Sequence, residues 1–176
     1  MKDKPRWRNE DKHDQRWDAV VEASELMVER RFEDALLELK RVLEADAQNA
    51  YAFNLAGQAL WELDRLEPAR DAFRAAVLVT PEFLGARVAL SHVLRRLGDA
   101  PGAEQQARIA VTRFPGDGEA MHALGLALAA RGKRKEARKN LEGFLSTSPE
   151  FEASTEVRGV LEMLGLGEED EPLDVD

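Results

Sequence analysis

The sequence predicts an all-α fold, an α-solenoid of helix-turn-helix units, and two observations carry this prediction. First, an alanine, a small residue and a proline each recur every 34 positions without insertion. Second, the apolar residues between them follow the i, i+3, i+4, i+7 spacing of a buried helix face. A repeat of this length is typical of an array in which stacked units share one continuous core.

Each recurring position has its own physical reason. An alanine and a small residue let two short helices cross closely, whereas a larger side chain would separate them. Proline lacks an N–H and clashes with the preceding turn, so it ends helices between units. Gly98 and Gly132 fall at the break inside their units, where a helix end favours a positive φ. The alanine positions are Ala35, Ala69, Ala103 and Ala137; the small-residue positions are Ala23, Gly57, Ser91, Gly125 and Gly159; the proline positions are Ala47, Pro81, Pro115 and Pro149.

Residues 50–83 are the most complete unit. The residues that define its pattern are Leu60, Ala69, Phe73, Ala76 and Pro81. This pattern resembles the tetratricopeptide repeat (TPR) family, which often has Tyr where Leu60 stands. The resemblance covers residues 16–151 and implies a right-handed solenoid of four units that recognises other proteins.

The same frame divides the whole chain. We expect an N-terminal polar arm, four repeats, a cap helix and an acidic tail. The boundaries are 1–15 for the arm, 16–49, 50–83, 84–117 and 118–151 for the repeats, 152–166 for the cap helix and 167–176 for the tail. The first repeat should begin with one helix at about 17–29, and its polar Glu22 is typical of a terminal repeat. We expect Trp7 of the arm to dock on the protein's own end.

Composition narrows the function. The chain has 176 residues, 44% of them apolar, and a net charge of −9, which argues against general binding to a phosphate backbone. It has no cysteine, so neither disulfides nor a Cys metal site are expected. The N-terminus carries no apolar run of the kind a secretory signal needs, and no stretch approaches the length of a membrane span. We therefore expect a cytoplasmic, non-enzymatic protein without a cofactor.

The family resemblance implies a concave groove lined by the first helix of each repeat. Following the 34-residue steps gives an aromatic and apolar N-terminal part and a polar, basic middle. Aromatic residues beside arginine are typical of interface hot spots, so we expect a peptide or helix of a partner protein with apolar anchors and some acid. The alternative is that Trp17, Trp61 and Met27 are core or cap contacts. The predicted lining residues are Trp17, Val20, Met27, Tyr51, Asn54, Gln58, Trp61, Val88, His92, Arg95, Arg96, His122 and Leu126.

Other functions have weaker support. Family members that bind acidic chaperone tails use a clamp of Lys, Asn and Arg, and the matching positions here supply no cations. The matching residues are Val20, Ser24, Leu55, Gly85 and Ala89, or one repeat later Asn54, Gln58, Ala89, Glu119 and Ala123. A chaperone-like factor that shields apolar client segments is the main alternative to an adaptor.

Two further alternative functions, RNA binding and a metal site, are suggested by clusters of charged or histidine residues. Residues 131–139 form a basic patch that would suit RNA or another anion, but no aromatic residues are interleaved to stack on bases, so nucleic acid is an unlikely partner. His92, His122 and Glu156 fall on adjacent predicted helices and are reasonable Zn²⁺ ligands, although no spacing motif supports a site. The oligomeric state is left open.

Overall fold

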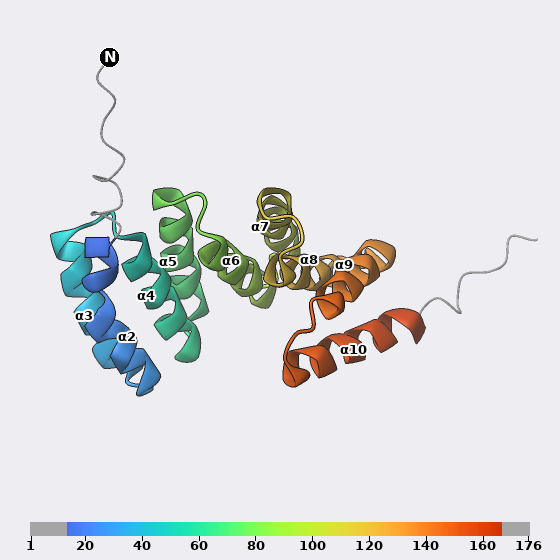
Figure 1. The fold of residues 1–176 in the computed structure, drawn as a ribbon, viewed down its shortest axis with the longest axis horizontal. Helices are drawn as coiled ribbons and strands as arrows, with labels where there is room; N and C mark the ends of the chain where they lie inside the picture. The colour runs from blue at the N-terminus through green and yellow to red at the C-terminus, as the bar shows by residue number, and fades with distance from the viewer. Residues whose placement is uncertain (1–13, 167–176) are drawn as a thin grey trace, which may run out of the picture. The chain divides into compact units, whose positions relative to one another are not determined.

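A computed structural model describes residues 14–166, and within this range all regular secondary structure is α-helical, apart from turns and bends (Figure 1). The predicted all-α fold is confirmed. The chain divides into two compact units between Ala86 and Arg87. Trp7, most of the predicted arm and the acidic tail lie outside the described residues. Within residues 14–166, no helix is both long enough and apolar enough to cross a bilayer.

The first unit holds two helix pairs. Its helices are α2 (Val21–Val28), α3 (Phe32–Ala45), α4 (Ala50–Glu62) and α5 (Leu66–Val79). α2 packs against α3 and α4 against α5, while α3 also packs against α4 (Figure 1). The array of the first unit is therefore continuous from one repeat to the next.

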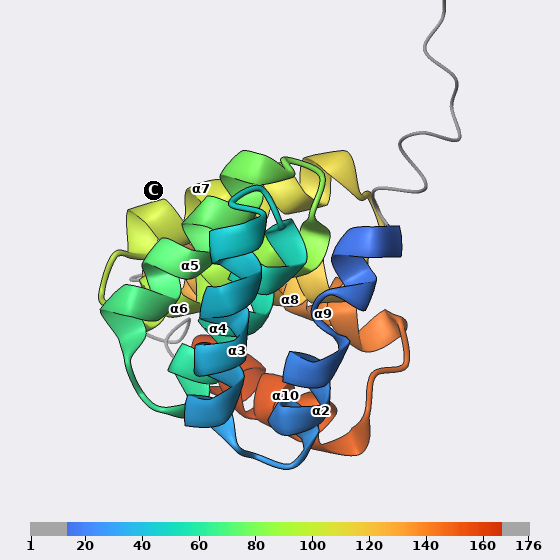
Figure 2. The ribbon, with the colours of Figure 1, turned by 90° about the vertical axis from the view of Figure 1, so that its left-hand side faces the viewer.

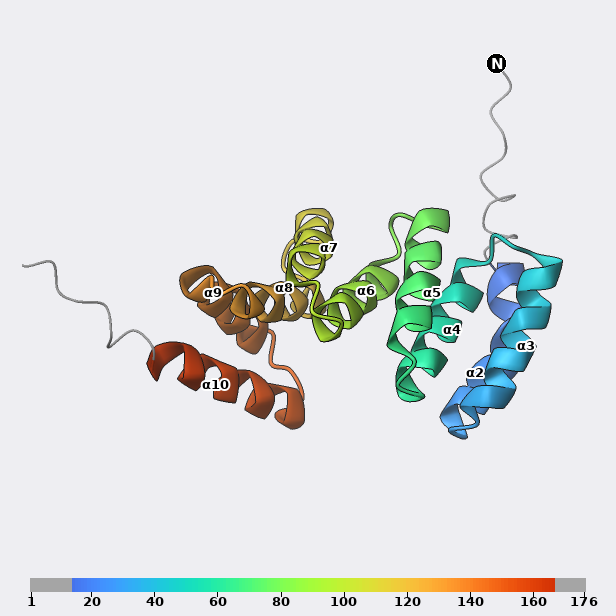
Figure 3. The ribbon, with the colours of Figure 1, turned by 180° about the vertical axis from the view of Figure 1, so that it is seen from behind.

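The second unit continues the same pattern. α6 (Leu84–Arg96) begins at the end of the first unit and runs into the second, which also contains α7 (Ala100–Arg113), α8 (Gly118–Ala130), α9 (Arg134–Ser146) and α10 (Phe151–Leu166). α8 packs against both α7 and α9, and α10 packs against α9 (Figure 3).

The helix starts repeat with the period read from the sequence. First helices begin at Ala50, Leu84 and Gly118, each 34 residues after the last. Second helices begin at Phe32, Leu66, Ala100 and Arg134 with the same spacing.

The turn inside each repeat requires one residue with a positive φ. The structure has this geometry at Arg30 (φ 58°), Asp64 (φ 57°), Gly98 (φ 83°) and Gly132 (φ 70°), again spaced by one repeat. The prediction for the two glycines is confirmed. Arg30 and Asp64 take the same backbone conformation, which is less favourable for residues with a Cβ, so the repeat geometry overrides their local preference.

The small-residue positions are tightly packed. A Cβ built on Gly57 would lie 2.6 Å from the ring of Phe73, and a Cβ on Gly125 would lie 2.5 Å from Leu141 Cδ2. In the third repeat, the hydroxyl of Ser91 donates a buried hydrogen bond of 2.9 Å to the carbonyl of Ala103. The alanines opposite, Ala35, Ala69, Ala103 and Ala137, are all fully buried. In the second and fourth repeats the glycine therefore accommodates a side chain of the opposite helix, and in the third repeat Ser91 bonds to the opposite backbone.

The first helix differs from its prediction. Residues 14–18 are helical, but a turn at Ala19 and Val20 separates them from α2, so the expected single helix is interrupted (Figure 2). Tertiary contacts hold this segment: Asn49 Nδ2 donates to the Arg16 carbonyl at 2.9 Å, and Arg16 Nε donates to Asp46 at 2.6 Å. These bonds to the α3–α4 loop override the helical periodicity of the sequence.

α10 covers α9 with one apolar stripe. Val157 is fully buried and Leu164 is 8% exposed. Gly159 keeps the small-residue position, but a Cβ there would meet no atom within 4 Å. The position is open because, among the described residues, no second helix follows α10 to cross it.

This contrast gives a matched pair of substitutions. Gly125→Ala should lower the free energy of unfolding by about 1–3 kcal/mol, because the added methyl overpacks the crossing with the buried Leu141. Gly159→Ala should raise it by about 0.5–1 kcal/mol, because a helical alanine replaces glycine in open space. Urea unfolding monitored by circular dichroism measures both. Equal effects of the two substitutions would show that the frame of the fourth repeat is wrong.

Candidate protein-binding site

Three aromatic rings form a row in the first unit. Trp17 meets Tyr51 edge-on with ring centroids 5.4 Å apart, and Tyr51 meets Phe83 edge-on at 5.5 Å. Such pairs contribute about 0.5–1.5 kcal/mol beyond the area they bury. Trp17 nonetheless leaves 48% of its surface exposed. The row therefore ends in a large aromatic side chain that is held in place and still accessible.

Burial, followed by the negative charge of Asp14, raises the pKa of the Tyr51 hydroxyl. Tyr51 is therefore protonated at neutral pH and can serve as a hydrogen-bond donor. Phe83 was not among the predicted residues, because the 34-residue step from Tyr51 leads to Gly85. Phe83 instead reaches Tyr51 from the loop before α6, and a Cβ at Gly85 would make only an ordinary contact of 3.7 Å with its ring.

Val20 lies beneath this face rather than on it. It is fully buried in a core cluster with Ala23, Leu39, Val42 and Ala52. It can therefore support a binding surface by packing but offers no exposed area of its own.

The remaining predicted residues of the first unit differ in exposure. Met27 and Trp61 are half-buried, and Gln58 is exposed. Asn54 is 8% exposed, and its buried Oδ1 accepts no hydrogen bond. A buried acceptor without a partner is uncommon in folded proteins, which makes Asn54 the most unusual polar group of this face.

The second unit brings two histidines and an arginine together. His92 on α6 and His122 on α8 have ring centroids 5.5 Å apart with the rings tilted by 53°. His122 also stacks on Phe144 of α9 at 4.7 Å. Arg95 lies within one turn of His92 on α6. Its Nε is buried and donates no hydrogen bond, and His122 Nε2 is likewise buried without a partner.

Both histidines are held neutral. Burial lowers the pKa of His92 to about 4, and the charges of His122 and Arg95 add to the effect. Burial also lowers the pKa of His122; Glu156 and Glu119 oppose this shift, and Arg95 adds to it. At pH 7 each ring therefore carries one N–H donor and one acceptor nitrogen.

Three predicted residues of the second unit lie outside this cluster. Val88 and Leu126 are buried, with 6% and 7% of their surface exposed, and so contribute packing. Arg96 is exposed on α6. Phe144, which sequence reasoning did not assign to the site, enters it from a second helix, and a search restricted to first helices could not find it.

The geometry gives no support to the metal alternative. His92 and His122 are neighbours, but among residues 14–166 no group of three His, Cys, Asp or Glu side chains is arranged to hold a metal ion. Glu156 acts on His122 only as a nearby charge.

Part of the basic patch at residues 131–139 is already engaged within the protein. Glu104 of α7 is only 5% exposed and accepts hydrogen bonds from Arg131 at 2.7 Å, Lys133 at 2.8 Å and Arg108 at 2.8 Å. Burial alone would raise the pKa of Glu104, but hydrogen bonds from Lys133, Arg108 and Arg131 outweigh it and lower the pKa to about 2. Two cations of the patch therefore serve the packing of α7 against the α8–α9 turn.

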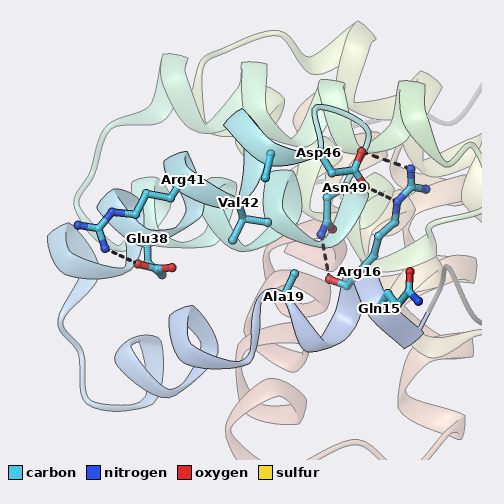
Figure 4. Close-up of a pocket in the computed structure, with 9 residues that line it drawn as sticks. Gln15, Arg16, Ala19, Glu38, Arg41, Val42, Asp46 and Asn49 are labelled. Atoms are coloured by element: carbon cyan, nitrogen blue, oxygen red, sulfur yellow. Dashed lines mark hydrogen bonds and ion pairs between the residues drawn. The ribbon is translucent and has the colours of Figure 1, made fainter.

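An open cavity of about 610 Å³ lies elsewhere in the first unit, between residues 15–19 and α3 (Figure 4). Its polar side chains largely satisfy one another through the Arg16–Asp46, Asn49–Arg16 and Glu38–Arg41 contacts. The sequence pattern did not predict this cavity, which is lined in part by Ala19 of the unexpected turn.

The fold and these faces define a helical repeat protein whose first helices present aromatic and polar side chains. The sequence model of the tetratricopeptide repeat matches residues 20–83 and 88–160. The chain therefore belongs to the tetratricopeptide repeat family, as its sequence pattern predicted.

Solved structures agree with this assignment of the fold. The chain is similar to YrrB, described as a TPR protein with an unusual peptide-binding site, with 23% identity, a TM-score of 0.71 and coverage of 85% of this chain and 76% of that one. It is similar to MamA 41-end from Desulfovibrio magneticus RS-1, with 19% identity, a TM-score of 0.74 and coverage of 91% and 87%. The first TPR of Spaghetti (RPAP3), bound to the HSP90 peptide SRMEEVD, is 24% identical over 68% of this chain and 96% of that one, with a TM-score of 0.60. Among curated proteins, none matches the sequence.

Glu104 provides a test of the internal ion cluster. Glu104→Gln should lower the free energy of unfolding by about 1.5–3 kcal/mol, since three cations lose a buried charged acceptor. Glu136→Gln is the control, because Glu136 pairs with Arg108 at 2.7 Å but is 52% exposed, and exposed pairs contribute about 0–1 kcal/mol. Denaturant unfolding at pH 7 compares the two variants, and equal losses would rule out a special role for Glu104.

The same cluster makes stability depend on pH. Since the pKa of Glu104 falls from 4.5 to about 2, its contribution to the free energy of unfolding is complete above pH 4.5 and is lost as the pH falls toward 2.

His92 makes stability depend on pH in a different range. Its pKa is lower in the folded protein than the ordinary 6.5, so the unfolded chain binds a proton first. Stability is therefore complete above pH 6.5 and falls as the pH drops toward 4. Between pH 7.5 and 4.5 the wild type should lose about 2–3 kcal/mol more than His92→Gln, measured by urea unfolding at both pH values. Parallel losses in the two proteins would show that His92 titrates normally.

Proposed function

We propose that this protein is a non-enzymatic interaction module that holds a peptide or short helix of a partner protein against the first helices of its repeats. Membership of the tetratricopeptide repeat family supports a protein-binding role. The observation that carries the proposal is the aromatic row of Trp17, Tyr51 and Phe83, which ends in the half-exposed Trp17.

The row has the properties of an interface anchor. Hot spots are enriched in tryptophan and tyrosine whose rings are held by neighbours, because little conformational entropy is then lost on binding. Tyr51 and Phe83 hold the row from within, while Trp17 offers area to a partner.

Other exposed apolar residues are less suited to this role. Leu37 on α3 and Leu78 on α5 are 55% and 75% exposed, but they lie on second helices. Single exposed leucines are normal on protein surfaces. They therefore serve as controls.

The test is a peptide-display selection on the immobilised full chain, followed by measurement of the dissociation constant of the enriched peptides. Trp17→Ala should weaken binding by about 30-fold or more, as expected for a hot-spot residue. Leu37→Ala should leave the affinity unchanged. Circular dichroism verifies that both variants are folded.

Two outcomes would contradict the proposal. Failure to enrich any peptide would argue against peptide binding, and equal affinities of Trp17→Ala and wild type would place the site elsewhere. Enrichment of apolar peptides without a shared pattern, together with suppressed aggregation of unfolded proteins, would instead favour client shielding.

A further inference from the structure

The open cavity of about 610 Å³ between residues 15–19 and α3 lies at the start of the array (Figure 4). Ala19, Val42 and Ala45 give it an apolar lining, and charged and amide side chains surround them. Its volume falls within the range of about 300–1,000 Å³ that is common for ligand pockets. The cavity therefore has room for one large side chain.

In the third and fourth repeats, a long side chain fills the equivalent space. Arg87 and Met121 stand two and three 34-residue steps after Ala19. Arg87 Nη1 donates a hydrogen bond of 2.9 Å to Gln106 Oε1 on α7. Met121 lies against α9, since a Cβ built on Gly143 would be 2.9 Å from its sulfur. In both repeats, this position of the first helix therefore packs on the second helix.

The first repeat has the same walls without the same filling. Gln106 and Gly143 correspond by the repeat spacing to Glu38 and Arg41, and both of these line the cavity. Ala19, however, offers only a methyl group, and it is exposed. The cavity is therefore a packing position that the first helix of this repeat does not fill.

The arm that precedes the cavity carries a side chain of suitable size. Trp7 is the only Phe, Tyr or Trp in residues 1–13, which lie outside the described part of the chain. The seven steps from Trp7 to Asp14 span up to about 25 Å when extended, and Gln15, the next residue, already lines the cavity. So short a tether gives an effective concentration on the order of millimolar, so even weak docking would be well populated.

The lining of the cavity suits an indole ring. Arg16 and Arg41 reach it from two different elements, and guanidinium groups are attracted to the face of a tryptophan ring (Figure 4). A buried indole N–H usually finds an acceptor. The carboxylates of Glu38 and Asp46 line the cavity and can each accept more than one hydrogen bond.

The charges of the arm and of the first repeat are also complementary. Residues 1–13 contain five Lys or Arg against three Asp or Glu, whereas residues 14–49 contain five against ten. A net positive arm therefore precedes a net negative repeat, and charges of opposite sign at short range attract one another. This attraction favours contact between the arm and its own repeat.

We propose that Trp7 inserts its indole ring into this cavity, so that the N-terminal arm closes the open face of the first repeat. A terminal repeat has one face without a neighbour, and the docked arm supplies the missing contact. Trp17 contacts Tyr51 and is not among the residues that line the cavity. The docked arm therefore leaves Trp17 available to a partner, and the inference does not depend on peptide binding.

The experiment incorporates 5-fluorotryptophan into the full chain and follows its three tryptophan resonances by ¹⁹F NMR. Single Trp→Phe substitutions assign them. The Trp7 resonance should lie away from its position in concentrated urea. A soluble paramagnetic agent should broaden it less than the resonance of Trp17, which is 48% exposed.

A matched pair of substitutions tests the cavity itself. Ala19→Met places in the cavity the side chain that the fourth repeat has there, so it should expel Trp7 and move its resonance to the position found in urea. Ala56→Met is the control, because Ala56 lines a different pocket of about 360 Å³ beside α3 that Gln15 and Arg16 do not line. It should leave the Trp7 resonance unchanged. Circular dichroism verifies that both variants are folded.

Three results would overturn the proposal. A wild-type Trp7 resonance at its position in urea would show that the ring is not docked, whatever the variants do. An unchanged Trp7 resonance in folded Ala19→Met would place the ring outside this cavity. A Trp7 resonance that depends on protein concentration would show that the arm of a second copy is bound instead.

Discussion

The close crossing of the two helices in each repeat is the constraint on which the rest depends. At Gly57 and Gly125 a single added carbon would collide with Phe73 and Leu141. Each crossing fixes where the neighbouring helices lie, and with them the side chains on the first helices. The faces that carry Trp17 or His122 are positioned by contacts made beneath them, because each repeat buries its apolar surface only against its neighbours.

The sequence predicted the fold well because its signals come from local packing and backbone geometry. The spacing of Ala69, Gly125 and Gly132 reflects short-range steric rules that hold in every repeat. The turn at Ala19 and Val20 could not be predicted in this way, since Asn49 and Asp46 hold it through contacts across the fold. The spacing of apolar residues indicates which face of a helix is buried, but it does not indicate hydrogen bonds between residues far apart in the sequence.

The candidate site was predicted only in part, for a related reason. The set of first-helix positions placed Tyr51 one 34-residue step after Trp17, and it contained His92 and His122, which no such step connects; in the structure the rings of each pair are neighbours. It also included Val20, which is buried, and it omitted Phe83 and Phe144, which enter from a loop and a second helix. A register error of one residue moves a side chain by about 100° around a helix, enough to exchange lining and core. The burial of the site residues and their contacts with distant parts of the chain depend on the tertiary structure, which the spacing of residues in the sequence does not give.

The ion pairs between repeats differ between the two units, and this difference bears on cooperativity. In the first unit, Arg65 reaches Glu33 and Arg30 reaches Glu62 across the repeat boundary, all with exposed side chains. In the second unit, the nearly buried Glu104 of the third repeat holds Arg131 and Lys133 of the fourth. In a one-dimensional array, the coupling between neighbours decides whether repeats melt singly or together. The third and fourth repeats should therefore unfold as one step that salt hardly alters, whereas salt should loosen the coupling of the first two.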